Sequence, residues 1–286
     1  MKHHILQPGT AALVLFAFTS LISACASAPQ GDGQAFRHRV HTHMLRNTSA
    51  EDVRAEINFG RDVAARVLGR FPLLRDAPLT RYVNLVGTAL AVQAGRPELT
   101  FHFAVLDSDS VNAYSAPGGY IFITRGALAM AEDEAELAAV LAHEIAHVSQ
   151  RHIVAALNIR AGDDSGAAGM GRMLSAGTDT ARVAFMQALD QAVKILFESG
   201  YSQQDELESD RIATLLLSDS GLDPLALRRY LARVHSHSDE DPALNTTHPP
   251  SQQRLQRLDR LITEEGLAEL ELATNTTRFE RYVKIQ

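Results

Sequence analysis

The stretch "VLAHEIAHVSQRH", Val140 to His152, places two histidines and a glutamate inside an otherwise apolar run. His143 and His147 are four residues apart, so on a helix their side chains lie on the same face, one above the other. Two imidazoles in that arrangement can bind a single Zn²⁺. Glu144 lies beside His143 and can take a proton from water that a zinc ion acidifies to a pKa of about 7. The pattern is the HExxH motif of zinc hydrolases.

A catalytic zinc needs a third protein ligand and an open fourth position. The residues after His147 lack the Gly and His of a metzincin continuation, so we expect the third ligand on another helix. The segment "YSQQDELESDRIA", residues 201–213, offers Glu206, with Asp210 one turn later to accept a hydrogen bond from a ligand histidine. A solvated acidic face is the alternative interpretation of this segment.

The order of these segments resembles the HtpX and CAAX-prenyl-endopeptidase family of zinc metallopeptidases, which are gluzincins. The likeness runs from about residue 50 to residue 262. One position departs from it, because Gln203 stands where the family usually has arginine. The stretches that carry the likeness are "VNAYSAPGGYIFITRGAL", "HEIAHVSQRH", "YSQQDELESDRIA" and "THPPSQQRLQRL".

The resemblance implies one zinc ion per chain, bound by His143, His147 and Glu206, with Glu144 as the general base. It implies that the cleft is bordered by the extended stretch around Asn112 and Ala113, where a free strand edge could hold a peptide. For Asn112 the alternative is a turn residue.

Three further side chains are candidates for roles at this site. Tyr201 and Arg254 are candidate donors to the charge that develops in the transition state, and the sequence does not choose between them. His248, in "HPP", is a candidate removable fourth ligand that would keep the enzyme quiescent. The alternative for His248 is a capping or packing histidine.

Hydrophobic periodicity predicts an α+β fold, mostly helical, with a small sheet beside the zinc helix. We expect a metallopeptidase domain over residues 49–266 and a C-terminal extension, 267–286, that packs on it. A loop rich in Gly, Ala and Ser is expected at 162–177. Strands are expected at 99–106 and 118–124, and helices at 49–68, 78–95, 132–157, 181–201, 205–221, 223–237 and 251–266.

The first 24 residues have the pattern of an export signal. Lys2 precedes an apolar run, residues 11–22, that is too short to span a bilayer. The run leads into "ISAC", which resembles a bacterial lipobox that ends at Cys25, the only cysteine of the chain. We therefore expect a signal peptide at 1–24, a lipid on Cys25, a tether at 25–48, and anchoring on the periplasmic side of the outer membrane, which Ala26 favours.

The charge balance bounds the partners. The formal net charge of −7 argues against a nucleic-acid partner. The sequence thus predicts a lipid-anchored zinc metalloendopeptidase that cleaves misfolded or unassembled envelope proteins. One alternative is a zinc-stabilised chaperone or binding lipoprotein without proteolytic turnover. Another is a non-proteolytic zinc hydrolase, such as a cell-wall amidase.

Overall fold

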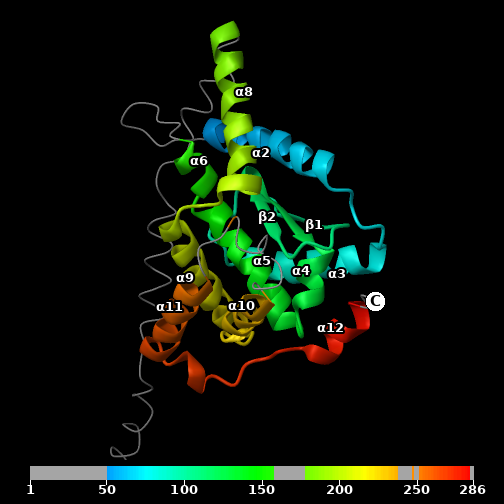
Figure 1. Cartoon of the computed structure of the whole chain (residues 1–286), viewed down its shortest axis with the longest axis vertical. Helices are drawn as coiled ribbons and strands as arrows, with labels where there is room; N and C mark the ends of the chain where they lie inside the picture. Colours follow the sequence, from blue (N-terminus) through cyan, green and yellow to red (C-terminus); the bar gives the residue numbers. More distant parts are fainter. Residues whose placement is uncertain (1–49, 158–177, 238–246, 248–250, 284–286) are drawn as a thin grey trace, which may run out of the picture. The chain divides into compact units, whose positions relative to one another are not determined.

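The computed structural model of the chain describes residues 50–157, 178–237, 247 and 251–283. Helices dominate these residues, and one small sheet lies among them, which confirms the predicted α+β class (Figure 1). The helices are α2 (Ala50–Arg70), α3 (Ala77–Ala91), α4 (Arg125–Met130), α5 (Glu134–Ser149), α6 (His152–Ala156), α8 (Asp179–Lys194), α9 (Gln203–Asp219), α10 (Ala226–His237), α11 (Ser251–Glu264) and α12 (Thr276–Tyr282). Short 3-10 or π turns, η1 (Pro117–Gly119), η2 (Ile195–Ser199) and η4 (Leu267–Glu269), complete the described elements.

The sheet has three strands in the order β1-β3-β2. β1 (His102–Leu106) runs parallel to β3 (Tyr120–Thr124), and β2 (Ala113–Ala116) runs antiparallel to β3. The expected strand at 118–124 starts at Tyr120, because Gly118 and Gly119 have positive φ values of 76° and 100°. The turn that they form joins β2 to β3.

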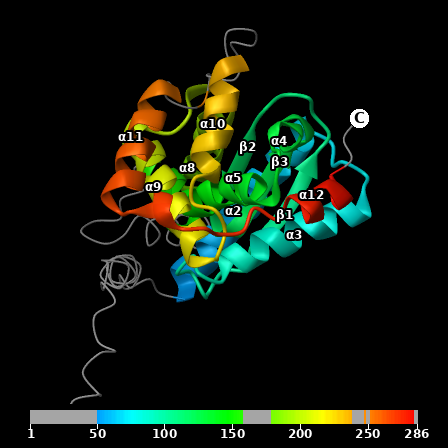
Figure 2. The ribbon, with the colours of Figure 1, turned by 90° about the horizontal axis from the view of Figure 1, so that it is seen from below.

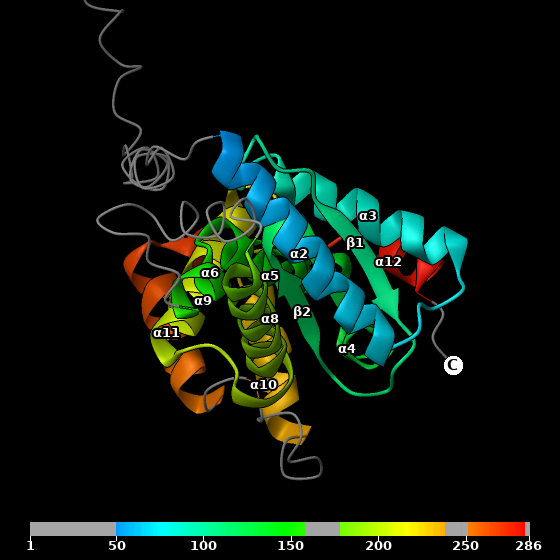
Figure 3. The same ribbon diagram turned by 90° about the horizontal axis from the view of Figure 1, so that it is seen from above.

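Alternating strand residues face two separate cores, as the two-residue period of a strand requires. Phe103, Ile121 and Ile123 pack with α3 and α5 on one face of the sheet. The residues between them, including Ala104 and Phe122, pack with α2 and α8 on the other face. Figure 3 shows α2 crossing this second face, and Figure 2 shows α12 lying against α3. The sheet is thus covered on both sides.

Close backbone contact fixes α2 against the sheet. A Cβ atom on Gly60 would lie 1.6 Å from the carbonyl oxygen of Pro117, so only glycine fits there. This contact joins α2 to η1, next to the strand that borders the candidate site.

Helix α5 begins where the sequence predicts and ends earlier. Asp133 caps it, accepting a hydrogen bond from the backbone N–H of Glu136 at 2.8 Å. The prediction of one helix over 132–157 is wrong, because Arg151 adopts a left-handed conformation (φ 58°, ψ 37°) and α6 starts afresh at His152. The sequence also did not predict β2 as a regular strand, nor α4 and α12.

Several predicted segments lie outside the described residues, namely the signal peptide, the tether with Cys25, the loop at 162–177 and His248. Within the described ranges, no helix combines the length and the apolar character that a membrane crossing needs.

Candidate metal centre

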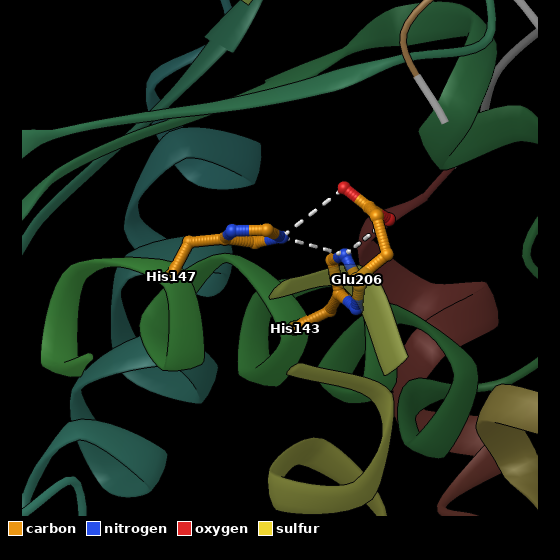
Figure 4. A group of neighbouring side chains, drawn as sticks. All are labelled: His143, His147 and Glu206. Atoms are coloured by element: carbon orange, nitrogen blue, oxygen red, sulfur yellow. Dashed lines mark hydrogen bonds and ion pairs between the residues drawn. The ribbon is translucent and has the colours of Figure 1, made fainter. Parts of the chain in front are cut away.

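Two buried helices bring three metal-binding side chains together. Every residue of α5 from Glu134 to Ser149 is buried, and this helix carries His143 and His147. Helix α9 packs along it and carries Glu206, which has no exposed surface. Figure 4 shows the two imidazoles and the carboxylate pointing at one another from these helices. Their ligand atoms all lie within 4.8 Å of one another.

The start of α9 places Glu206 by local hydrogen bonding. Gly200, with φ 67°, ends the preceding π turn, and Ser202 caps the new helix. Ser202 and Asp205 form a capping box, in which each side chain binds the other residue's backbone N–H. Glu206 therefore sits in the first turn of the helix, facing α5.

The spacing of the three ligand atoms fits a zinc ion. The two Nε2 atoms of His143 and His147 are 3.1 Å apart, and the Glu206 oxygens lie 3.4 Å and 3.5 Å from them. Ligands around a tetrahedral Zn²⁺ at 2.0–2.2 Å are about 3.3–3.6 Å apart. Two histidines and one glutamate are also the ligand set of one class of catalytic zinc site.

The charge of the site also fits a cation. Glu144, Glu206 and Asp210 are all buried here, and Arg254 is the arginine that the structure places among them. Without a metal, Arg254 and a protonated His143 face these three carboxylates, and buried charge of one sign is costly unless a counter-ion offsets it.

Asp210 and Arg254 hold His143 from behind. Nδ1 of His143 lies 3.0 Å from an oxygen of Asp210, which leaves Nε2 to face the ligand cluster. Arg254, on α11, donates to both oxygens of Asp210, at 2.6 Å and 2.7 Å. Burial favours the neutral form of Asp210, but the charge and hydrogen bonds of Arg254, together with those of His143, outweigh it and lower the pKa of Asp210 to about 2. Asp210 therefore stays ionised.

The two histidines of the cluster have different electrostatic environments in the absence of a metal. Burial lowers the pKa of His147 to about 3, against a smaller opposing effect of Glu206. Burial also disfavours the charged form of His143, but its hydrogen bonds to Asp210 and Glu206 raise its pKa to about 9. His147 is thus neutral in the absence of a metal, the form in which an imidazole can bind one.

A residue that sequence reasoning gave no role lies behind His147. Nδ1 of His152 is 2.9 Å from Nδ1 of His147, and His152 is buried. The signal that could have pointed to it is its place in the stretch "HEIAHVSQRH". Its five-residue distance from His147 does not predict contact on a continuous helix, because the break at Arg151 is what makes the contact.

Glu144 and Tyr201 also line this region. Glu144 is buried next to His143, and its negative charge, after burial, contributes to a raised pKa of the Tyr201 hydroxyl. The ring of Tyr201 stacks on that of His147, with centroids 3.8 Å apart. Tyr201 therefore remains a neutral O–H donor.

The sheet edge beside the site is β2. The N–H of Thr124 donates to the carbonyl of Asn112 at 3.0 Å, so Asn112, Tyr114 and Ala116 turn their backbone groups toward β3. The intervening residues Ala113 and Ser115 turn theirs outward.

Two of the outward backbone groups of β2 have partners within the chain. The carbonyl of Ser115 accepts from the Tyr201 hydroxyl at 3.3 Å. The N–H of Ala113 donates to the side chain of Asn112 at 2.9 Å, so this outer edge is partly engaged.

Gln203, the departure from the family pattern, makes no ion pair among the described residues. Its side-chain amide donates to that of Gln253 on α11. Helices α9 and α11 are thus joined by two amides at this point.

Comparison with known families also indicates a metallopeptidase. The profile of Peptidase family M48 matches residues 78–262, well over half of the chain. The matched region contains α5, α9 and α11, the helices that carry the cluster.

The curated relatives of the chain include proteins named as proteases. The Beta-barrel assembly-enhancing protease of Escherichia coli (strain K12) is 30% identical over 209 residues, which are 70% of this chain and 42% of that protein. The mitochondrial metalloendopeptidase OMA1 of Schizosaccharomyces pombe is 28% identical over 194 residues, 65% of this chain and 54% of that protein. The metalloprotease LoiP of Escherichia coli is 24% identical over 201 residues, 66% of this chain and 71% of that protein.

The chain spans less than half of the length of the first of these relatives. The resemblance predicted from the sequence is nevertheless confirmed over most of this chain's own length. The chain belongs to Peptidase family M48.

Proposed function

We propose that the chain is a zinc-dependent metalloendopeptidase. The observation that carries the proposal is the convergence of His143, His147 and Glu206 in a buried site that also holds Glu144. A purely structural zinc site usually has four protein ligands and has no use for a general base. Family membership supports the same conclusion.

His143, His147 and Glu206 would hold the zinc ion. When bound, zinc supplies a Lewis acid that acidifies water and polarises a carbonyl. Glu144 takes the proton from the attacking water and passes it to the nitrogen of the leaving amine. Asp210 fixes the ring orientation of His143, and Arg254 keeps Asp210 ionised.

Tyr201 is the better of the two candidate donors to the transition state. Its hydroxyl is neutral, and its ring stacks on that of His147. The hydroxyl donates to the carbonyl of Ser115 in the structure, and a substrate on this edge of β2 would take that carbonyl and release the hydroxyl. Arg254 has its Nε and Nη2 atoms committed to Asp210, so we give it a supporting role. A substrate peptide would lie along the outer edge of β2, at Ala113 and Ser115. It would displace the Asn112 side chain from the N–H of Ala113.

The cellular setting is part of the proposal. We propose a signal peptide at 1–24, a lipid on Cys25, a tether at 25–48, a catalytic domain at 49–266 and a packed extension at 267–286. Relatives named as a beta-barrel assembly-enhancing protease and as LoiP, both from Escherichia coli, support a site of action in the bacterial envelope. The substrates would be misfolded or unassembled envelope proteins, and His248 would act as a removable fourth ligand that limits activity at rest.

Metal removal and return test the proposal. The full-length chain, in detergent, is treated with a chelator and then given zinc, and cleavage of an unstructured protein is followed at each stage. We expect cleavage to disappear with the metal and to return with zinc. Zinc binding without cleavage, in both the wild type and a His248→Ala variant, would favour the binding-lipoprotein alternative.

A further inference from the structure

The chain turns sharply after the helix that carries both candidate histidine ligands. Arg151 has φ 58° and ψ 37°, a left-handed conformation that residues other than glycine rarely adopt. On an uninterrupted helix, residue 152 would lie about 140° around the axis from residue 147. The turn instead brings the ring of His152 beside that of His147, with centroids 4.9 Å apart.

His152 lies between the two helices that carry the metal ligands. Its Nδ1 is 2.9 Å from Nδ1 of His147 on α5. Its Nε2 is 3.7 Å from Asp205 and 3.8 Å from Glu208, both on α9. The ring is buried, at 4% exposure, and Oγ of Ser209 on α9 also lies 3.5 Å from its Nδ1.

These contacts fit one placement of the ring protons on His147 and His152. If Nε2 of His147 faces a metal, its ring proton is on Nδ1 and is donated to Nδ1 of His152. His152 then carries its own proton on Nε2, which is the atom that faces the carboxylates of α9. Ligand histidines usually donate to a carboxylate or a carbonyl, and here a second histidine takes that place.

A buried charge cluster holds the turn that positions His152. Glu56 on α2 has no exposed surface, and one of its oxygens lies 3.0 Å from Nε of Arg151 and 2.9 Å from Nη2 of Arg96. Arg96 also donates to the carbonyl of Val148, near the end of α5, at 3.2 Å. Two arginines and one glutamate therefore join α2 to the end of the zinc helix and to the strained residue.

We propose that His152 is a positioning residue for the metal centre. It fixes the tautomer and the orientation of His147, and the Glu56–Arg96–Arg151 cluster fixes the turn that puts it there. This inference rests on the proposed function in one respect, because it requires that His143, His147 and Glu206 bind zinc.

Zinc affinity of the full-length chain, measured by competition with a chelator, tests the proposal. His152→Leu keeps the volume and removes the acceptor, and we expect zinc to bind about 10–100-fold more weakly. His152→Asn offers an amide oxygen near the position of Nδ1, so we expect affinity within about threefold of the wild type. His102→Ala, at an exposed histidine on β1 at the far edge of the sheet, is the matched control and should leave affinity unchanged.

Two further measurements make the outcome decisive. The absorption spectrum of the cobalt-substituted protein should change in His152→Leu and remain near wild type in His152→Asn. Thermal unfolding of the metal-free proteins checks folding, and His152→Ala replaces the leucine variant if that variant does not fold. Affinity equal to wild type in the leucine or alanine variant, or equally weak in the asparagine variant, would overturn the role of His152 alone. A wild-type chain that binds no zinc would overturn the proposed function with it.

Discussion

The two ends of helix α5 treat buried charge in opposite ways. At its start, Glu134 and Glu136 are buried, and each is matched by arginines from the C-terminal half of the chain. Glu134 also accepts from the hydroxyl of Tyr82 at 2.9 Å and the amide of Asn275 at 3.0 Å. The second half of the same helix carries the two imidazoles. Three buried carboxylates, Glu144, Glu206 and Asp210, lie there, and Arg254 is the arginine among them.

Buried charges at the start of α5 hold helices together, and those in its second half surround the candidate metal site. The first end is closed, because each of its buried carboxylates, Asp133, Glu134 and Glu136, contacts an arginine. These pairs join α5 to α10 and α12. At the second end one arginine lies among three buried carboxylates, and three ligand atoms converge on one point. Removing a charge from the first end should therefore reduce stability, and removing a ligand from the second should remove metal and activity.

The largest effect is expected from the loss of a ligand. His147→Ala should lower the rate of peptide cleavage on the order of 10³-fold or more, beyond the 10–100-fold typical of a ligand's hydrogen-bond partner. Zinc content by elemental analysis and cleavage of an unstructured protein measure this, with His237→Ala on the exposed end of α10 as control. An alanine variant that kept its zinc and its rate would contradict the ligand assignment.

The next effect is expected at the closed end. Glu136→Gln removes the carboxylate that Arg233 contacts at 2.6 Å and Arg229 at 3.3 Å. The free energy of unfolding should fall by about 3 kcal/mol, toward the lower end for a broken buried pair, because both arginines keep some contact with water. Denaturant unfolding measures this, and zinc affinity should not change. A loss of zinc with unchanged stability would reverse the comparison.

A smaller effect concerns pH. The pKa of Asp210 is lowered from 3.8 to about 2 in the folded state, so its contribution to stability is fully present above about pH 4 and is lost as the pH falls through about 2. The metal-free chain should lose about 2 kcal/mol of unfolding free energy across this window from Asp210 alone. Unfolding curves at each pH, compared with Asp210→Asn, measure the difference. Parallel pH profiles for the two proteins would show that Asp210 does not contribute.

The smallest effect is expected for a charge pair at the surface. Arg228 on α10 and Asp259 on α11 are 2.6 Å apart, and both side chains are exposed. Arg228→Ala should change the free energy of unfolding by less than about 1 kcal/mol and should leave zinc binding intact. A larger loss would mean that burial is not what distinguishes the pairs at the start of α5.

The sequence alone predicted the parts of the site that depend on local spacing. The four-residue separation of His143 and His147 places them on one helical face whatever the rest of the fold does. The caps of the two helices that meet at the site, Asp133 and Ser202, were not predicted. The α+β class followed from periodicity in the same way.

The remainder depends on contacts that no local pattern contains. The break at Arg151 is held by Glu56, which lies far away in sequence, so apolar periodicity continued through it and predicted one long helix. The part that His152 plays behind His147 follows from that break. Arg254 was one of two candidates for stabilising the transition state, and its engagement with Asp210 became visible only when α11 was seen to pack on α9.

The most direct test of the central claim is the rate of the Glu144→Gln variant at matched zinc content. The wild type and the variant are loaded with zinc, their metal content is measured, and both are incubated with the same unstructured protein. We expect equal zinc in the two proteins and a cleavage rate lower by about 10²–10⁴-fold in the variant, as is typical for the loss of a general base. Equal zinc and equal cleavage rates would contradict it, because Glu144 would then have no part in the chemistry.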